Sequence, residues 1–187
     1  MERSSAFTLC LTIVNIGLVV AALVGYVREG NPLSWAAFSE RMRFTRMTGR
    51  LWGWSIASAL GFGILALLVN SFAAWIFTLL HFEIAEFATG RASLSLQVVT
   101  LFFNIVGEEL WWRGYILPRQ ELAFGKYTWL VHGLLWACFH LYKWYAVPFM
   151  LITCQIIPFV AQRTRSTWPG VVSHLFVNGA GTVMAYL

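Results

Sequence analysis

The chain has 187 residues, of which 59% are hydrophobic and 11% are charged, and its mean hydropathy is +0.68. This composition excludes an ordinary soluble domain and is typical of a polytopic membrane protein. The length suits a single domain of about six spans, because each span takes roughly 20 residues. The net charge of +5 is the excess expected of cytoplasmic loops, so we expect no nucleic-acid partner.

Six apolar stretches predict a bundle of about six transmembrane helices. They cover about residues 7–27, 51–80, 93–117, 127–142, 148–162 and 169–186. The first stretch is longer than the apolar core of a signal peptide, and basic charge follows it, so we expect an uncleaved span. Ser93 is a candidate cap for the third helix, and Pro118 is expected to end that helix.

Residues 32–50 are too polar to cross a membrane. Trp35, Phe38 and Met42 are spaced by three and four residues, and arginines lie among them. This pattern predicts a helix that lies on the cytoplasmic surface and contacts anionic lipid. A plain basic loop is the alternative interpretation.

The positions of Lys and Arg predict the orientation of the spans. The first, third and fifth loops contain nine of these residues: Arg28, Arg41, Arg43, Arg46, Arg50, Arg119, Lys126, Arg163 and Arg165. The N-terminus and the other loops contain three: Arg3, Arg91 and Lys143. This bias predicts that the first set of loops is cytoplasmic and that the N-terminus is outside.

Ionisable side chains are rare inside membranes and often indicate a functional site. Among the polar residues of the predicted spans we single out Glu108, Glu109, Arg113, His140, His174 and Asn178. Glu109 and Arg113 are four residues apart on one helix face, so we expect them to pair. Glu108 points about 100° away and has Trp112 one turn later, so it is expected to lack an intrahelical partner, as suits a general base. The alternative is that both glutamates only bind neighbouring helices.

His174 and Asn178 are also four residues apart and could both donate hydrogen bonds to an oxyanion. A polar pair in a span can equally well join two helices, and His140 can simply be satisfied by a neighbour. Counted from the predicted cytoplasmic helix ends, these residues and Glu108 lie within about 12 Å of one another in depth. We therefore expect one polar cavity that opens toward the cytoplasm.

The sequence excludes several known schemes of intramembrane proteolysis. It contains no Asp, no HExxH zinc motif and no GxSG serine motif. What remains is a glutamate, two histidines and an asparagine. Glu108 and His140 could deprotonate a water molecule, while His174 and Asn178 could stabilise the charge that develops on a carbonyl oxygen.

The segment EELWWRGYILPRQ resembles the EExxxR motif of the CAAX-protease and bacteriocin-processing family of glutamate-type intramembrane proteases. That family has two later motifs, FxxxH and HxxxN. Here they correspond to WACFH (136–140), with Trp136 in place of the usual Phe, and HLFVN (174–178). The three motifs occur in family order, so the resemblance covers about the C-terminal half.

The resemblance implies that Glu108 activates the water, with help from His140, and that His174 and Asn178 form the oxyanion site. It also implies supporting roles for Glu109 and Arg113. No metal or other cofactor is required. A zinc ion bound by Glu108, His140 and His174 stays open, because these are acceptable ligand types.

We therefore expect an all-α membrane bundle with a cytoplasmic interfacial helix, forming one domain over residues 1–187 with a protease-like core at 93–187. The expected function is hydrolysis of a peptide bond in a membrane-anchored protein or peptide near the cytoplasmic boundary, with C-terminal sorting signals as one substrate class. The expected location is a bacterial inner membrane, with the lipid bilayer and the substrate as partners. The alternative is a non-catalytic binding, immunity or regulatory protein.

Overall fold

The computed structural model describes residues 3–82 and 92–186 of the chain. All regular structure within these two ranges is helical, which confirms the predicted all-α fold class. The longer helices are α1 (Arg3–Arg28), α3 (Gly49–Leu79), α4 (Leu94–Glu108), α6 (Thr128–Phe139) and α9 (Trp168–Tyr186). The shorter elements are α2 (Trp35–Arg41), the π-helical η1 (Glu109–Ile116), α5 (Leu117–Phe124), the 3₁₀ turns η2 (Gly125–Tyr127) and η3 (Leu141–Lys143), α7 (Val147–Thr153) and α8 (Ile156–Thr164).

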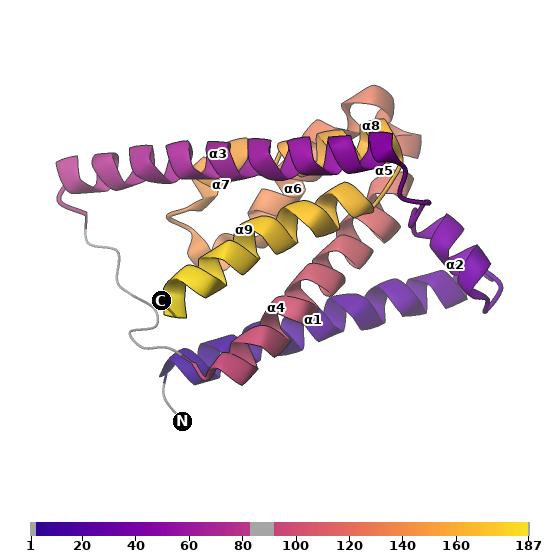
Figure 1. Cartoon of the computed structure of the whole chain (residues 1–187), viewed down its shortest axis with the longest axis horizontal. Helices are drawn as coiled ribbons and strands as arrows, with labels where there is room; N and C mark the ends of the chain where they lie inside the picture. Colours follow the sequence, from indigo (N-terminus) through magenta and orange to yellow (C-terminus); the bar gives the residue numbers. More distant parts are fainter. Residues whose placement is uncertain (1–2, 83–91, 187) are drawn as a thin grey trace.

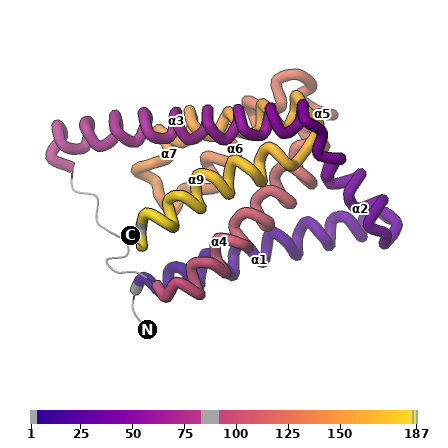
Figure 2. The backbone as a smooth tube through the Cα atoms, in the orientation of Figure 1, coloured from indigo at the N-terminus to yellow at the C-terminus, as the bar shows by residue number. Residues whose placement is uncertain are grey.

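The long helices run back and forth between two ends of the molecule. Both chain termini lie at one end, which we call the terminal end (Figure 1). The opposite end, which we call the arginine-rich end, holds residues 28–50, 117–127 and 163–167 (Figure 2). α1 packs along α4, α3 packs along α9, and α4 also contacts α9, so α4 and α9 form the centre of the bundle.

Two of the described helices are long and apolar enough to cross a membrane, judged by length and composition: Ser4–Arg28 and Gly49–Leu79. The second of these, α3, exposes a row of large apolar side chains that includes Ile56, Leu60, Ile64 and Phe72. Contiguous apolar surface of this extent is rare on water-soluble monomers. This surface fits a lipid environment.

The third predicted helix does not end at Pro118. η1 and α5 carry it on to Phe124, and it ends at Gly125, whose φ of 52° lies in the left-handed region. A proline in a helix leaves the carbonyl four residues earlier without its N–H donor. Here Arg41 of α2 donates a hydrogen bond of 3.4 Å to that carbonyl, on Gly114. Pro118 also lies in the first turn of α5, directly after the π-helical turn, where a missing backbone N–H is tolerated.

The predicted helix at 127–142 is shorter in the structure, because α6 ends at Phe139. His140 accounts for this end: its ring Nδ1 lies 2.9 Å from the carbonyl oxygen of Trp136, the acceptor that an α-helix would give to the backbone N–H of His140. That N–H bonds instead to the carbonyl of Ala137. The competition between side chain and backbone ends the helix.

The predicted helix at 148–162 is two helices, α7 and α8, separated at Cys154 and Gln155. Pro158 has no N–H to donate to the carbonyl of Cys154, which explains why the hydrogen-bond ladder is interrupted there.

The predicted surface helix exists, but only as the seven residues of α2. Trp35 is 73% exposed, as expected for a residue that contacts lipid. Met42 is fully buried in an apolar cluster with Tyr26 and Leu110, so its predicted role as a lipid anchor is wrong. The segment packs onto η1 because Gly114 leaves room for the backbone of Met42.

Candidate active site

The change from α-helix to π-helix falls between the two adjacent glutamates. Glu108 is the last residue of α4, and Glu109 is the first residue of η1. Short π-helical stretches are rare and occur often at functional sites. Both side chains are buried, but they point to different surroundings.

The carboxylate of Glu108 accepts one hydrogen bond on each oxygen. Asn104 donates to Oε1 at 2.6 Å, and the indole Nε1 of Trp136 donates to Oε2 at 2.7 Å. The prediction that Glu108 lacks an intrahelical partner is therefore wrong, because Asn104 lies one turn earlier on the same helix. The two donors hold the carboxylate in a fixed orientation and leave its remaining lone pairs free.

His140 faces the same carboxylate. Its Nδ1 lies against the carbonyl oxygen of Trp136, which can only accept a hydrogen bond, so the ring proton belongs on Nδ1. The other ring nitrogen, Nε2, lies 4.0 Å from Oε1 of Glu108. In the neutral ring, Nε2 and the carboxylate are both acceptors, separated by more than a direct hydrogen bond. This geometry suits a small donor between them that has two hydrogens to give.

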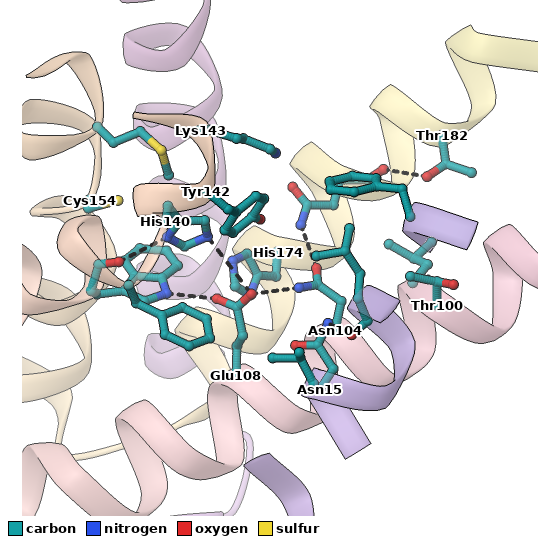
Figure 3. A pocket seen from close by; sticks show the side chains of 18 of the residues that line it. Asn15, Thr100, Asn104, Glu108, His140, Tyr142, Lys143, Cys154, His174 and Thr182 are labelled. Carbon is teal, nitrogen blue, oxygen red and sulfur yellow. Dashed lines mark hydrogen bonds and ion pairs between the residues drawn. The ribbon is translucent and has the colours of Figure 1, made fainter. Parts of the chain in front are cut away.

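A cavity of about 530 Å³ lies beside Glu108, between α1, α4, α6, α7 and α9. Glu108, His140, His174 and Asn178 all line it, and Figure 3 shows both imidazoles directed toward the Glu108 carboxylate. The structure therefore brings the four predicted catalytic side chains together around one cavity.

The direction of this cavity differs from the expectation. It continues past Cys10, Gln97 and Thr182, which lie on the halves of α1, α4 and α9 nearest the terminal end. The predicted opening toward the arginine-rich loops is therefore wrong. The predicted depths assumed that Pro118 ends a helix and that His140 lies inside one, and neither is so.

Glu109 belongs to a separate, fully buried cluster. Its Oε1 lies 3.0 Å from Nη1 of Arg113 and 2.8 Å from Nδ1 of His174, which confirms the predicted pairing with Arg113. Neither contact has the angles of a good hydrogen bond, so opposite charge holds the cluster more than aligned donors do. Gly170 of α9 lies so close that a Cβ there would overlap Oε2 of Glu109.

Trp136 separates the two glutamates. One edge of its ring donates to Glu108, while the guanidinium of Arg113 lies over its face, 3.7 Å from the ring centroid. Its ring also contacts the imidazole of His174 edge-on, with centroids 5.3 Å apart. Trp136 therefore contacts both groups and fixes the position of Glu108 relative to the Glu109–Arg113 pair.

Asn178 and His174 both reach the site, but each has a further contact. Asn178 donates to Oδ1 of Asn104 at 2.8 Å, so a chain of amides connects it to Glu108. His174 contacts Glu109 through Nδ1, which leaves Nε2 for the cavity. The sequence reasoning missed Asn104 and the indole donor of Trp136. Asn104 could have been found, since it lies four residues before Glu108.

The zinc arrangement left open by the sequence is not formed. Within residues 3–82 and 92–186, no group of three His, Cys, Asp or Glu side chains is placed to hold a metal ion.

Residues 90–180 match the family described as Rce1-like, type II CAAX prenyl endopeptidase Rce1-like. This match confirms the family resemblance stated from the sequence, and residues 108–113, 136–140 and 174–178 fall inside the matched range. Members of the family are integral membrane proteins, in agreement with the two apolar helices. No curated protein and no solved structure gives a match to the chain.

Proposed function

We propose that the chain is an intramembrane endopeptidase that uses Glu108 and His140 to activate water. The observation that carries this proposal is the 4.0 Å separation between Oε1 of Glu108 and Nε2 of His140. A water molecule between them would donate one hydrogen to each acceptor and keep its oxygen lone pairs for attack. Both acceptors are held by other contacts, so little reorganisation is needed.

The reaction proceeds by attack of the water oxygen on the carbonyl carbon of the scissile peptide bond. One water proton passes to Glu108 as the C–O bond forms, and the carbonyl oxygen becomes negatively charged. Asn178, which lines the same cavity, donates a hydrogen bond to that oxygen, and His174 donates from Nε2 in its doubly protonated form, because its Nδ1 already faces the Glu109 carboxylate. The C–N bond then breaks as Glu108 returns the proton to the departing nitrogen, giving one carboxylic acid and one amine.

Glu109 and Arg113 support the site without touching the substrate in this scheme. Glu109 orients the His174 ring through Nδ1, and Arg113 compensates the charge of Glu109. A carboxylate of this kind behind a catalytic imidazole fixes which ring nitrogen faces the substrate.

The substrate is a protein or peptide anchored in the membrane that enters from the terminal end, where the cavity extends. The positive-inside bias assigns that end to the non-cytoplasmic side. The cleavage site then lies nearer that boundary than the cytoplasmic one. Two substrate classes are consistent with the family and the sequence: prenylated C-terminal motifs and C-terminal sorting signals with an anchor helix.

The test compares membranes that contain the wild type with membranes that contain Glu108→Gln, both incubated in ¹⁸O-water. New protein C-termini are then identified by mass spectrometry. We expect ¹⁸O-labelled C-termini in the wild-type membranes that are missing with the variant. A purified assay with a farnesylated peptide and an unprenylated anchor-helix peptide assigns the substrate class. Equal labelling in both membranes contradicts the proposal and favours a binding or immunity role.

A further inference from the structure

A second cavity lies at the arginine-rich end, away from the site just described. Its volume is about 380 Å³, within the range of small-ligand sites. Three arginines line it, one from the connection before α3, one from the first turn of α3 and one from the end of α8: Arg46, Arg50 and Arg163. The other lining residues are Thr45, Thr48, Leu51, Trp54 and Thr164. We call this site the arginine cavity.

The charge of the arginine cavity is unbalanced. Three other arginines at the same end have acidic partners: Arg41 and Arg119 both contact Glu29, and Arg43 contacts Glu121 through two hydrogen bonds of 2.9 and 2.6 Å. None of the three cavity arginines has an acidic partner among the residues that the structure describes, and no carboxylate lines the cavity.

Three like charges around one small space repel one another. An anion that enters the space removes this repulsion, and guanidinium groups match the oxygens of a phosphate in charge and geometry. Thr48 adds a neutral donor, since its hydroxyl oxygen accepts from the backbone N–H of Leu51 and its own hydrogen stays available. The cavity therefore presents donors of the kind that phosphate needs.

The position of the cavity indicates the source of the phosphate. It surrounds the beginning of α3, which is one of the two helices able to cross a membrane. Trp54 lines it, and the nearby Trp52 and Trp35 are exposed. Tryptophans of this kind lie at the level of lipid headgroups. By the positive-inside bias this is also the cytoplasmic leaflet, where anionic lipids gather.

We propose that the arginine cavity binds the phosphate of an anionic membrane lipid. The lipid chains lie along the apolar outer face of α3, and the headgroup phosphate sits between Arg46, Arg50 and Arg163. The site is independent of the cavity at Glu108 and does not depend on proteolysis.

The test uses the full chain in nanodiscs made from equimolar phosphatidylcholine and phosphatidylglycerol. The protein is released by detergent, and the lipids that stay bound are counted by native mass spectrometry. The variants are Arg163→Gln alone and Arg46→Gln with Arg50→Gln. Arg28→Gln is the matched control: it removes the same charge from an exposed arginine at the same end that does not line the cavity. Melting temperatures identify any variant that is misfolded.

We expect the wild type and Arg28→Gln to retain phosphatidylglycerol in preference to phosphatidylcholine. Each cavity arginine that is replaced should weaken retention by at least about tenfold, the loss of one hydrogen bond between charged groups. Equal retention by Arg28→Gln and by the well-folded cavity variants overturns the proposal, because bulk charge then explains the binding. Inorganic phosphate should not displace the lipid, since it lacks the chains. Displacement at equal concentration, or an absence of preference for phosphatidylglycerol, also overturns it.

Discussion

The surroundings of Glu108 and of Glu109 differ in almost every respect, although the two residues are neighbours in the chain. Glu108 lines a cavity, accepts hydrogen bonds from two neutral donors and faces His140 across 4.0 Å. Glu109 is fully buried against Arg113, His174 and Gly170. The first arrangement leaves a carboxylate able to exchange a proton with a substrate, whereas the second fixes a charge in place.

Two consecutive acidic residues in a membrane helix can therefore have entirely different surroundings, one beside a cavity and one in a buried ion pair. An uncompensated buried charge is strongly destabilising, and the chain avoids that penalty at Glu109 by direct ion pairing. At Glu108 it uses neutral hydrogen bonds and a polar cavity instead, which suits the proposed role as a base, because a cationic partner would lower the affinity of the carboxylate for a proton. The first three predictions below each act on one of the two sides, and the fourth acts on the residue between them.

The largest effect is expected on the Glu108 side, from His140→Ala. The substitution removes the second acceptor for water, so turnover should fall by a factor of about 10² to 10⁴, the usual contribution of one acid–base group. The fold should persist, because the His140 ring bonds only to a carbonyl at a helix end. His132→Ala is the control: it removes a buried histidine of the same helix that bonds to Gln120, so stability should fall and turnover per folded molecule should not. A similar loss of turnover per folded molecule in both variants would contradict a specific role for His140 beside Glu108.

On the Glu109 side, Arg113→Ala should lower the free energy of unfolding by about 3–5 kcal/mol, because it leaves a buried carboxylate without its cation. Unfolding in mixed micelles measures this change. Arg43→Ala breaks a partly exposed pair with Glu121, for which about 1 kcal/mol or less is expected. Equal destabilisation of the two variants would mean that the buried Arg113–Glu109 pair contributes no more to the free energy of unfolding than the partly exposed Arg43–Glu121 pair.

Gly170→Ala tests the close packing behind Glu109. The new methyl group must push the carboxylate away from Arg113 and His174, so stability should fall by about 1–3 kcal/mol. Gly181→Ala, in the same helix, has no atom within 4 Å of the added Cβ and should be neutral or slightly stabilising. Thermal unfolding of both variants in detergent gives the comparison, and a neutral result for Gly170→Ala would show that Glu109 can move freely.

The smallest effect is expected from Trp136→Phe, which acts on the boundary between the two sides. Phe keeps an aromatic face for Arg113 but loses the N–H that bonds to Glu108. We expect turnover to fall by about tenfold to a hundredfold, consistent with the loss of one hydrogen bond to a charged group. Trp136→Ala removes both contacts and should also destabilise the protein. A larger loss of turnover in the Phe variant than in the Ala variant would contradict this role.

Spacing within one helix predicted some of the contacts at the site, although the Asn104–Glu108 hydrogen bond, between residues four apart, was missed. The pairing of Glu109 with Arg113 followed from their separation by four residues, and the motif residues could be placed on three helices. Contacts between helices were not readable in the same way. The hydrogen bond from Arg41 to the Gly114 carbonyl, for example, joins residues 73 positions apart. The direction of the cavity depends on where helices end, so it could not be predicted once those ends were misplaced.

The central claim is that Glu108 performs the chemistry and that Glu109 maintains the structure, and one matched pair of variants tests it directly. Glu108→Gln and Glu109→Gln are purified side by side, and turnover per folded molecule and the unfolding midpoint are measured for each. We predict that Glu108→Gln loses at least about a thousandfold in turnover with a nearly unchanged midpoint. Glu109→Gln should unfold more easily and retain more turnover than Glu108→Gln. The reverse pattern, or equal turnover in the two variants, would contradict the account.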